Sequence, residues 1–299
     1  QGRARPVIAA EWRARWAALP GNTRGVVWAL FNAFGFSLAL VCIKGSGQRL
    51  PIIEIVFFSV AGQLLFLSAP TVRANIAILR GRRLGMQMLR VVVLLATMLT
   101  GFAAVVMLPV ANSTSITFAK PMFTTVLAVL ILHEVVVWQR WVLTVVGFAG
   151  VIVLARPEIG GFGWGSIYAI ASAVLAAAGA ILTRILAQSE RPGTLILFQA
   201  LVTIAAIAPF VWATWVTPTG WELLMLVLIG LTGAIGGLVQ ILAFRAAEAS
   251  VIAPIDYTRL FFSTALGYLV FAEVPNAWTL LGIAVIVASS LAALRYERG

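Results

Sequence analysis

The sequence predicts an all-α polytopic membrane protein in which ten transmembrane helices form two inverted five-helix repeats. Three observations lead to this fold class: the composition, ten apolar stretches of membrane-spanning length, and an internal repeat. Of the 299 residues, 62% are hydrophobic and only 10% are charged, whereas about a quarter of the residues of a soluble domain are charged. Because so few charges cannot cover a water-exposed surface, the lipid bilayer must be the main solvent.

Helices of about 20 apolar residues are long enough to cross the roughly 30 Å of hydrocarbon in a bilayer. Prolines and glycines mark the boundaries between such stretches, as at Pro20-Gly21, Pro51 and Pro275. The ten predicted spans are residues 25–44, 51–69, 87–108, 111–132, 139–156, 164–185, 194–216, 221–243, 251–271 and 277–294.

Basic residues are distributed unequally between the two sets of alternate loops. Of the 21 lysines and arginines, sixteen lie in the set that includes both termini, whereas Lys44, Arg49 and Arg156 are the three in the other set. Loops rich in lysine and arginine stay in the cytoplasm. Both termini are therefore expected in the cytoplasm, with the chain crossing the cell inner (plasma) membrane many times. The net charge of +11 is then mostly a topology signal, and no nucleic-acid partner is expected.

An internal repeat relates residues 111–134 to residues 250–273 without a gap, and it pairs Lys120 with Arg259. Five spans separate the two copies, and because five is odd the second copy must be inserted upside down. Inverted repeats are typical of transporters, whose substrate sites lie near the midplane between the repeats. The predicted divisions are a cytoplasmic arm (1–24), a first repeat (25–156), a second, inverted repeat (157–294) and a cytoplasmic tail (295–299).

The two cations inside spans are the first candidates for a substrate site, because ionisable residues at membrane depth usually face a cavity or a partner. Lys120 lies about ten residues from either end of its span and has no acid one turn away. It could anchor a substrate carboxylate, or it could be a structural cation bonded to helix carbonyls freed by Pro121. Arg259 follows Asp256 by three residues, so the two could pair structurally or contact substrate. Such pairing would keep Asp256 ionised, which argues against a role as a proton carrier.

Further candidates flank these cations or lie at span ends. Tyr257 is the best aromatic candidate because a buried hydroxyl needs a partner, while ordinary helix packing explains Phe118 and Phe123 equally well. Ser115 belongs to a polar edge before Lys120. Trp164 and Tyr168 could line an extracellular mouth, although an interfacial aromatic belt also accounts for the tryptophan. The full set of candidate substrate-binding residues is Lys120, Arg259, Asp256, Tyr257, Phe118, Phe123, Ser115, Tyr168 and Trp164.

Three acidic residues near span ends, Glu54, Glu134 and Glu273, are candidates for gating or coupling. The last two occupy equivalent positions of the repeat. Other polar residues inside spans can be explained by hydrogen bonds between helices as well as by ligand contact. They are Asn32, Gln63, Gln199 and Gln240.

Two long stretches carry a resemblance to a known family. The stretch "LPVANSTSITFAKPMFTTVLAVLILHE" is followed by "GFAGVIVLARP", and "AEASVIAPIDYTRLFFSTALGYLVFAE" by "LGIAVIVAS". This pattern resembles the drug/metabolite transporter superfamily, specifically its ten-helix EamA-type proteins, over essentially the whole chain. The resemblance implies transport of amino acids or other metabolites without enzymatic activity or cofactors. Within the superfamily, the chain is similar to amino acid exporters, including those for aromatic amino acids.

The function expected from these observations is export of amino acids, aromatic ones among them, by alternating access or exchange. Its partners would be an amino acid-like small molecule and the lipid bilayer, and a monomer could suffice. Export of another metabolite or a drug is the alternative. A channel is disfavoured by the inverted repeat. An intramembrane enzyme or metal site is disfavoured because the sequence holds one histidine and one cysteine and lacks the common hydrolase motifs.

Overall fold

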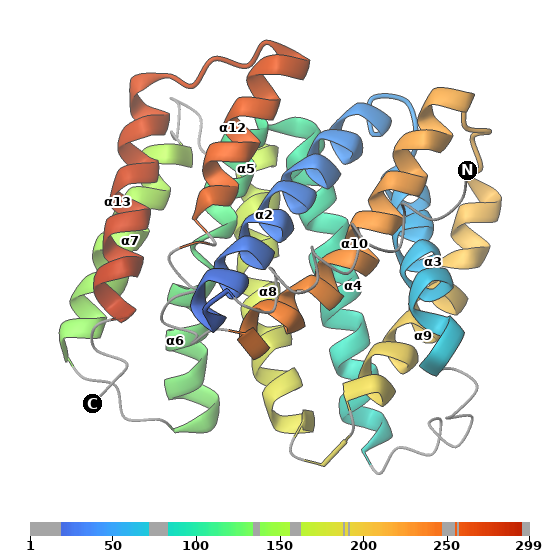
Figure 1. The fold of residues 1–299 in the computed structure, drawn as a ribbon, viewed down its shortest axis with the longest axis horizontal. Helices are drawn as coiled ribbons and strands as arrows, with labels where there is room; N and C mark the ends of the chain where they lie inside the picture. The colour runs from blue at the N-terminus through green and yellow to red at the C-terminus, as the bar shows by residue number, and fades with distance from the viewer. Residues whose placement is uncertain are drawn as a thin grey trace, which may run out of the picture.

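The computed structural model describes residues 19–71, 83–133, 138–155, 163–187, 189–190, 192–246, 255 and 257–294, and this part of the chain is helical without a strand (Figure 1). The helices are α2 (Gly21–Ser46), α3 (Ile52–Thr71), α4 (Leu84–Met107), α5 (Val110–Thr117), α6 (Lys120–Leu132), α7 (Trp138–Ala155), α8 (Trp164–Ala187), α9 (Pro192–Ala213), α10 (Gly220–Ala246), α12 (Thr258–Phe271) and α13 (Ala277–Leu294).

In the described residues, each of the ten predicted spans coincides largely with helical structure. In the described residues, six segments are long and apolar enough to cross a membrane, and they lie in α2, α4, α5 with α6, α8, α9 and α10. Four shorter apolar helical segments lie in α3, α7, α12 and α13. The prediction of an all-α polytopic membrane protein is thereby confirmed. Large apolar side chains such as Trp212 and Leu269 are exposed on the outside of the bundle, where a bilayer would contact them.

The predicted span 111–132 is divided into α5 and α6 by a break at Phe118 and Ala119. The Phe118 N–H donates to the Thr114 and Ser115 carbonyl oxygens at 3.2 and 3.1 Å, which closes the last turn of α5. Pro121, which has no N–H, follows Lys120 in the first turn of α6, a position where proline is well tolerated. The lysine therefore begins a helix instead of lying within a continuous one.

Two helices of the repeat end in the same way at equivalent residues. His133 ends α6 with φ 53°, and Ala272 ends α12 with φ 55°. Among the described residues, these are the two non-glycine residues with positive φ. A left-handed residue after the last turn is a common way to end a helix. Its recurrence at the two positions that the sequence repeat pairs supports the five-helix repeat.

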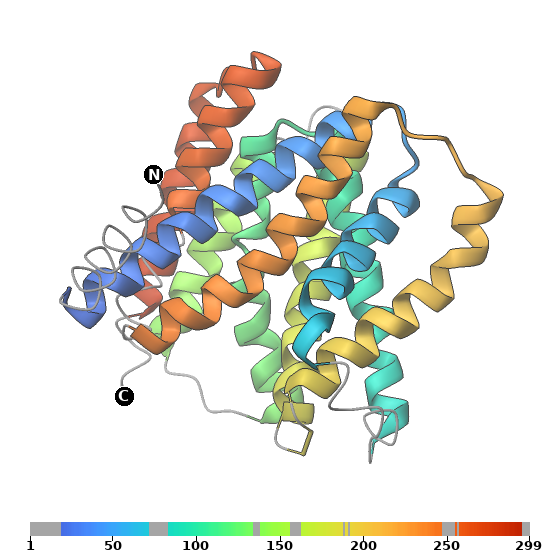
Figure 2. The same cartoon turned by 45° about the vertical axis from the view of Figure 1, so that its right-hand side comes forward.

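The packing between helices is also repeated. The helix α2 packs along α10, and α4 packs along α8 in the same way; both pairs lie side by side in Figures 1 and 2. Likewise α3 contacts α10 as α9 contacts α4, and α2 contacts α12 as α8 contacts α6. If the first five spans are exchanged for the last five, each of these contacts becomes its counterpart in the other half. The halves therefore interlock, each first helix packing against the third helix of the other half, while the residue boundaries of the repeats stay a prediction.

Candidate substrate site

A cavity of about 470 Å³ lies between helices of both halves. This volume is within the range of pockets that hold drug-sized ligands. Its walls come from α2, α3, α4, α5, α8 and α10. The lining residues are Asn32, Phe36, Ala39, Leu40, Ile43, Ser59, Gln63, Thr97, Met98, Gly101, Phe102, Val105, Thr117, Ser172, Ile229, Thr232, Gly233, Gly236, Gly237 and Gln240.

The lining is polar in places but uncharged, since none of the lining residues in the described part of the chain is acidic or basic. Side-chain amides come from Asn32, Gln63 and Gln240, and aromatic surface comes from Phe36 and Phe102. Five hydroxyl-bearing residues, Ser59, Thr97, Thr117, Ser172 and Thr232, complete the polar part of the wall. Such a lining can recognise a ligand through directional hydrogen bonds and ring contacts.

Glycines on α10 make room for the cavity. A Cβ placed on Gly233 would lie 2.9 Å from Nε2 of Gln63, and one on Gly236 would lie 3.0 Å from Oδ1 of Asn32. A Cβ on Gly237 would meet nothing within 4 Å, so a side chain there would extend into open space. The GxxxG spacing of Gly233 and Gly237 therefore serves the cavity wall.

Arg259 lies one layer behind the cavity wall. Its Nη2 donates to Oε1 of Gln240 at 3.4 Å, and its guanidinium carbon lies 4.8 Å from the ring centre of Phe36. Asn32 donates from Nδ2 to the same oxygen of Gln240. Arg259 therefore contacts two lining residues, Gln240 and Phe36, but its own side chain is outside the lining.

The repeat equivalents Phe118 and Tyr257 stack on one another, with ring centres 5.1 Å apart and planes 28° apart. Because the sequence repeat pairs these two residues with each other, their stack lies where the two halves meet. Lys120 and Arg259 each follow two residues after a ring of this stack, Lys120 at the start of α6 and Arg259 in the first turn of α12. The structure therefore brings Phe118 and Tyr257 into contact, and the two predicted cations lie next to them along the chain. Lys120 is half-buried and outside the cavity lining, although Thr117, just before the break, belongs to it.

The other predicted substrate-binding residues of the described chain also lie outside the lining. Ser115 is fully buried and donates to the Ala111 carbonyl oxygen at 2.6 Å, and Phe123 packs edge-on against Phe148. Trp164 and Tyr168 face one another at the start of α8, with ring centres 6.2 Å apart. Asp256 lies outside the described residues. Substrate contact by any of these predicted residues stays a prediction.

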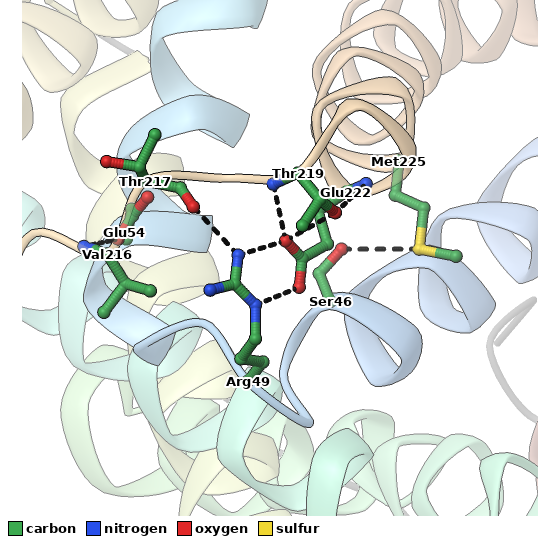
Figure 3. Close-up of polar contacts among 8 residues, drawn as sticks. All are labelled: Ser46, Arg49, Glu54, Val216, Thr217, Thr219, Glu222 and Met225. Atoms are coloured by element: carbon green, nitrogen blue, oxygen red, sulfur yellow. Dashed lines mark hydrogen bonds and ion pairs between the residues drawn. The ribbon is translucent and has the colours of Figure 1, made fainter.

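One end of the bundle, where α2 ends and α3 begins, is the end that the arginine distribution predicts to be extracellular; we call it the outer end. Arg49 pairs there with Glu222 of α10, its Nε donating to Oε1 at 2.7 Å (Figure 3). Its Nη2 also donates to the Thr217 carbonyl oxygen at 2.9 Å. The hydrogen bond to Glu222 raises the pKa of Arg49 above its ordinary value, so this cation is charged throughout the physiological range.

The Glu222 carboxylate is held in place by the start of its own helix. The Thr219 backbone N–H and hydroxyl both donate to Oε2, at 2.7 and 2.8 Å, and the Glu222 N–H donates back to the Thr219 hydroxyl oxygen. This reciprocal arrangement is a capping box, readable in the sequence as Thr-x-x-Glu. Nearby, the Val216 N–H donates at 3.2 Å to Glu54, a fully buried carboxylate that was predicted as a gate or coupling residue.

A second ion pair lies at the same end. Lys44, in the last turn of α2, pairs with Glu273 and donates to the Leu108 carbonyl oxygen at 2.6 Å. The other oxygen of Glu273 accepts the Val110 N–H at 2.7 Å, where a carboxylate interacts favourably with the positive end of α5. Both ion pairs join segments of different halves. The gating role predicted for Glu273 fits this position but stays a prediction, and Glu134 lies outside the described residues.

Sequence reasoning missed most of the cavity wall. It noted Asn32, Gln63 and Gln240 as polar residues of uncertain purpose, and it did not single out Phe36 or Thr97. A signal was present, because the lining residues recur every three or four positions along α2, α4 and α10, which places them on one face of each helix. Which of the apolar faces meet around a cavity depends on the packing of helices from both halves.

Comparisons with known proteins agree with this architecture. The model of the EamA-like transporter family matches residues 23–156 and again residues 163–295. The S-adenosylmethionine uptake transporter of Rickettsia prowazekii is 30% identical over 94% of this chain and 96% of its own. The riboflavin transporter of Rhizobium johnstonii is 28% identical over 91% of each chain, and the pseudopaline exporter CntI of Pseudomonas aeruginosa is 28% identical over 92% of this chain and 97% of its own.

A solved crystal structure of a protein 20% identical in sequence superposes with a TM-score of 0.59, covering 89% of this chain and 96% of the other. This likeness supports the fold. Two matches to one family model, at the places where the sequence repeat and the repeated packing lie, leave no part of the helical bundle unassigned. The chain therefore belongs to the EamA-like transporter family and is a multi-pass membrane transporter of the drug/metabolite transporter superfamily.

Proposed function

We propose that the protein moves a drug-sized amphipathic metabolite with a planar heteroaromatic part across a bacterial inner membrane by alternating access. The observation that carries this proposal is the cavity of about 470 Å³ with an uncharged, amide- and phenyl-bearing lining. The interlocked halves on either side of it provide the two bodies that alternating access requires. No enzymatic activity is proposed.

The dimensions and chemistry of the cavity favour a larger metabolite over a free amino acid. A single amino acid would fill only part of a pocket in the size range of drug-sized ligands. Amino acid export, the first expectation from the sequence, is for this reason less well supported than transport of another metabolite.

The relatives support the same choice of substrate class. By their names they transport S-adenosylmethionine, riboflavin and pseudopaline. S-adenosylmethionine contains an adenine ring and riboflavin a fused flavin ring, so two of the three cargoes join a planar heterocycle to a polar chain. The names include an uptake transporter and an exporter, so flux has to be measured in both directions.

The test is transport by the purified protein in liposomes, with labelled S-adenosylmethionine, riboflavin and phenylalanine compared at equal concentration. We expect saturable flux of at least one of the two heteroaromatic solutes and little flux of phenylalanine. Gly237→Leu should abolish this flux because its side chain enters the cavity. The matched control is Gly35→Leu on α2, where a Cβ likewise meets nothing within 4 Å but the residue is outside the lining. Saturable flux of phenylalanine alone would overturn the proposal.

A further inference from the structure

We propose that Asn32 and Gln240 form an oriented acceptor–donor pair that recognises the edge of a nucleobase-like heterocycle, and that Arg259 is the positioning residue that fixes their orientation. This inference rests on the proposed function, because it names the substrate chemistry of the same cavity. Substrates of this kind carry a ring nitrogen or carbonyl next to an N–H or amino group.

The orientation of the pair follows from the chemistry of arginine. A guanidinium has only donors, so the group of Gln240 that faces Nη2 of Arg259 at 3.4 Å must be the amide oxygen. The same oxygen accepts the amide nitrogen of Asn32. One acceptor thus receives two donors, and neither amide can turn over without placing two donors or two acceptors against each other.

Two polar atoms are then left to face the cavity, Nε2 of Gln240 as a donor and Oδ1 of Asn32 as an acceptor. Within the described part of the chain neither atom has a hydrogen-bond partner. Neither atom belongs to the fully buried side-chain atoms that lack a partner, so both are accessible to a ligand. Gly236 keeps the acceptor accessible, because a Cβ there would lie 3.0 Å from Oδ1 of Asn32. Both residues line the cavity.

An adjacent donor and acceptor complement a ligand edge that has an acceptor next to a donor. Adenine has such an edge, and asparagine or glutamine side chains bind it with two hydrogen bonds. A lactam or imide edge, as in other purines or a flavin, presents the same pair of atoms. An aliphatic amino acid side chain has no edge of this kind. The amide pair therefore selects by ring edge and not by net charge.

Phe36 supplies a surface for the flat face of such a ring. It lies one turn after Asn32 on α2 and also lines the cavity, with 38% of its surface exposed. Arg259 lies over its ring and polarises it through a cation–π contact. Stacking of a base on an aromatic side chain tolerates many ring types, so Phe36 would bind the class of planar rings while the amide pair distinguishes their edges.

The first test exchanges the donor for an acceptor. Gln240→Glu preserves the shape and the bond to Arg259 but replaces Nε2 with oxygen. The probes are adenosine, N6,N6-dimethyladenosine, whose donor is methylated, and benzamidine, which presents two donors. In equilibrium binding to the purified full-length protein, we expect the wild type to bind adenosine about tenfold more tightly than the dimethyl analogue. In Gln240→Glu both nucleosides should lose about tenfold in affinity, because both keep the ring nitrogen that Nε2 of Gln240 would contact, and benzamidine should gain affinity.

The matched control for the added carboxylate is Gln139→Glu near the start of α7, which should keep the wild-type affinities for both nucleosides and for benzamidine. The positioning role of Arg259 is tested by Arg259→Met, which leaves the Gln240 amide without its fixing donor. Discrimination between adenosine and the dimethyl analogue should then be lost while the affinity for the analogue is retained. A residue that supports only the fold would lower the affinities for both probes together.

A wild-type protein that binds both nucleosides equally, or a Gln240→Glu variant that keeps the wild-type affinity for adenosine, would overturn the inference. Either result leaves the proposed function standing if a heteroaromatic solute is still transported and Gly237→Leu still blocks its flux. Failure of the proposed function is seen separately, as flux of phenylalanine without flux of either heteroaromatic solute.

Discussion

Replacing Glu273 with glutamine should release the outer end of the bundle without unfolding it. The glutamine oxygen can still accept the Val110 N–H, which Glu273 receives at 2.7 Å. The charge that faces Lys44 is lost, and the lysine keeps its bond to the Leu108 carbonyl oxygen at 2.6 Å. The substitution therefore removes one interaction between the halves and leaves the start of α5 satisfied.

The magnitude follows from the exposure of the two side chains, 12% for Lys44 and 18% for Glu273. A hydrogen bond between charged groups contributes about 1.5–3 kcal/mol. Because both groups retain some contact with solvent, which weakens an ion pair, we take the lower limit, about 1.5 kcal/mol. That free energy corresponds to about a tenfold change in the ratio of closed to open conformers.

The assay is the labelling rate of a cysteine at the outer part of the cavity. Val105 lines the cavity near the end of α4, so Val105→Cys in a Cys42→Ser background reports on access for a membrane-impermeant maleimide added outside. We expect labelling about tenfold faster in Glu273→Gln and in Lys44→Met. The double variant should be no faster than either, because both changes remove the same interaction.

Gln48→Ala is the control, since Gln48 is an exposed residue of the loop between α2 and α3 and does not belong to the Lys44–Glu273 pair. Unchanged labelling in both single variants would show that the ion pair does not hold the outer end closed. Rates that multiply in the double variant would show that the two side chains act independently. Either result would refute the reasoning.

Three further predictions concern the contact between the halves and the role of Lys120. Gly230→Leu should lower the unfolding temperature, because a Cβ there would lie 2.8 Å from the Cα of the facing glycine of α3, while Gly85→Leu, in open space, should not; equal thermal curves would contradict this. Tyr257→Leu should destabilise the protein by about 1 kcal/mol through loss of its stack on Phe118, and the loss in the double variant with Phe118→Leu should be smaller than the sum of the two single losses, because both changes remove the same stack; additive losses would contradict it. Lys120→Met should reduce flux of an anionic or zwitterionic substrate in liposomes about tenfold if the lysine anchors a carboxylate, with an unchanged unfolding temperature; wild-type flux would leave Lys120 without that role.

The fold was largely readable from the sequence because the bilayer imposes strong local rules. Apolar stretches of about 20 residues predict spans, and wherever the structure describes their residues all ten coincide largely with helical structure. The repeat of residues 111–134 in 250–273 predicted two equivalent halves, and the left-handed helix ends at His133 and Ala272 agree with it. The break at Phe118 was not predicted, although the Lys-Pro pair beside it was noticed.

The candidate site was less predictable because it depends on contacts between residues far apart in sequence. Intramembrane charge directed attention to Lys120 and Arg259, and the structure brings both to the junction of the halves but outside the cavity wall. Gln240 and Asn32 looked like ordinary polar residues of two separate helices. Their importance lies in a shared hydrogen bond with Arg259, across 208 positions of the chain.

The sequence by itself determined that the lipid bilayer is the main solvent, and it determined the ten spans and the inverted repeat, because each of these follows from local hydropathy and from residues that recur at fixed spacing. Only the tertiary structure decided which helix faces enclose the cavity, which amides face it and which ion pairs join the halves at the outer end. The physical reason is that hydropathy acts on each helix separately, whereas hydrogen-bond orientation and cavity shape depend on helices from both halves at once.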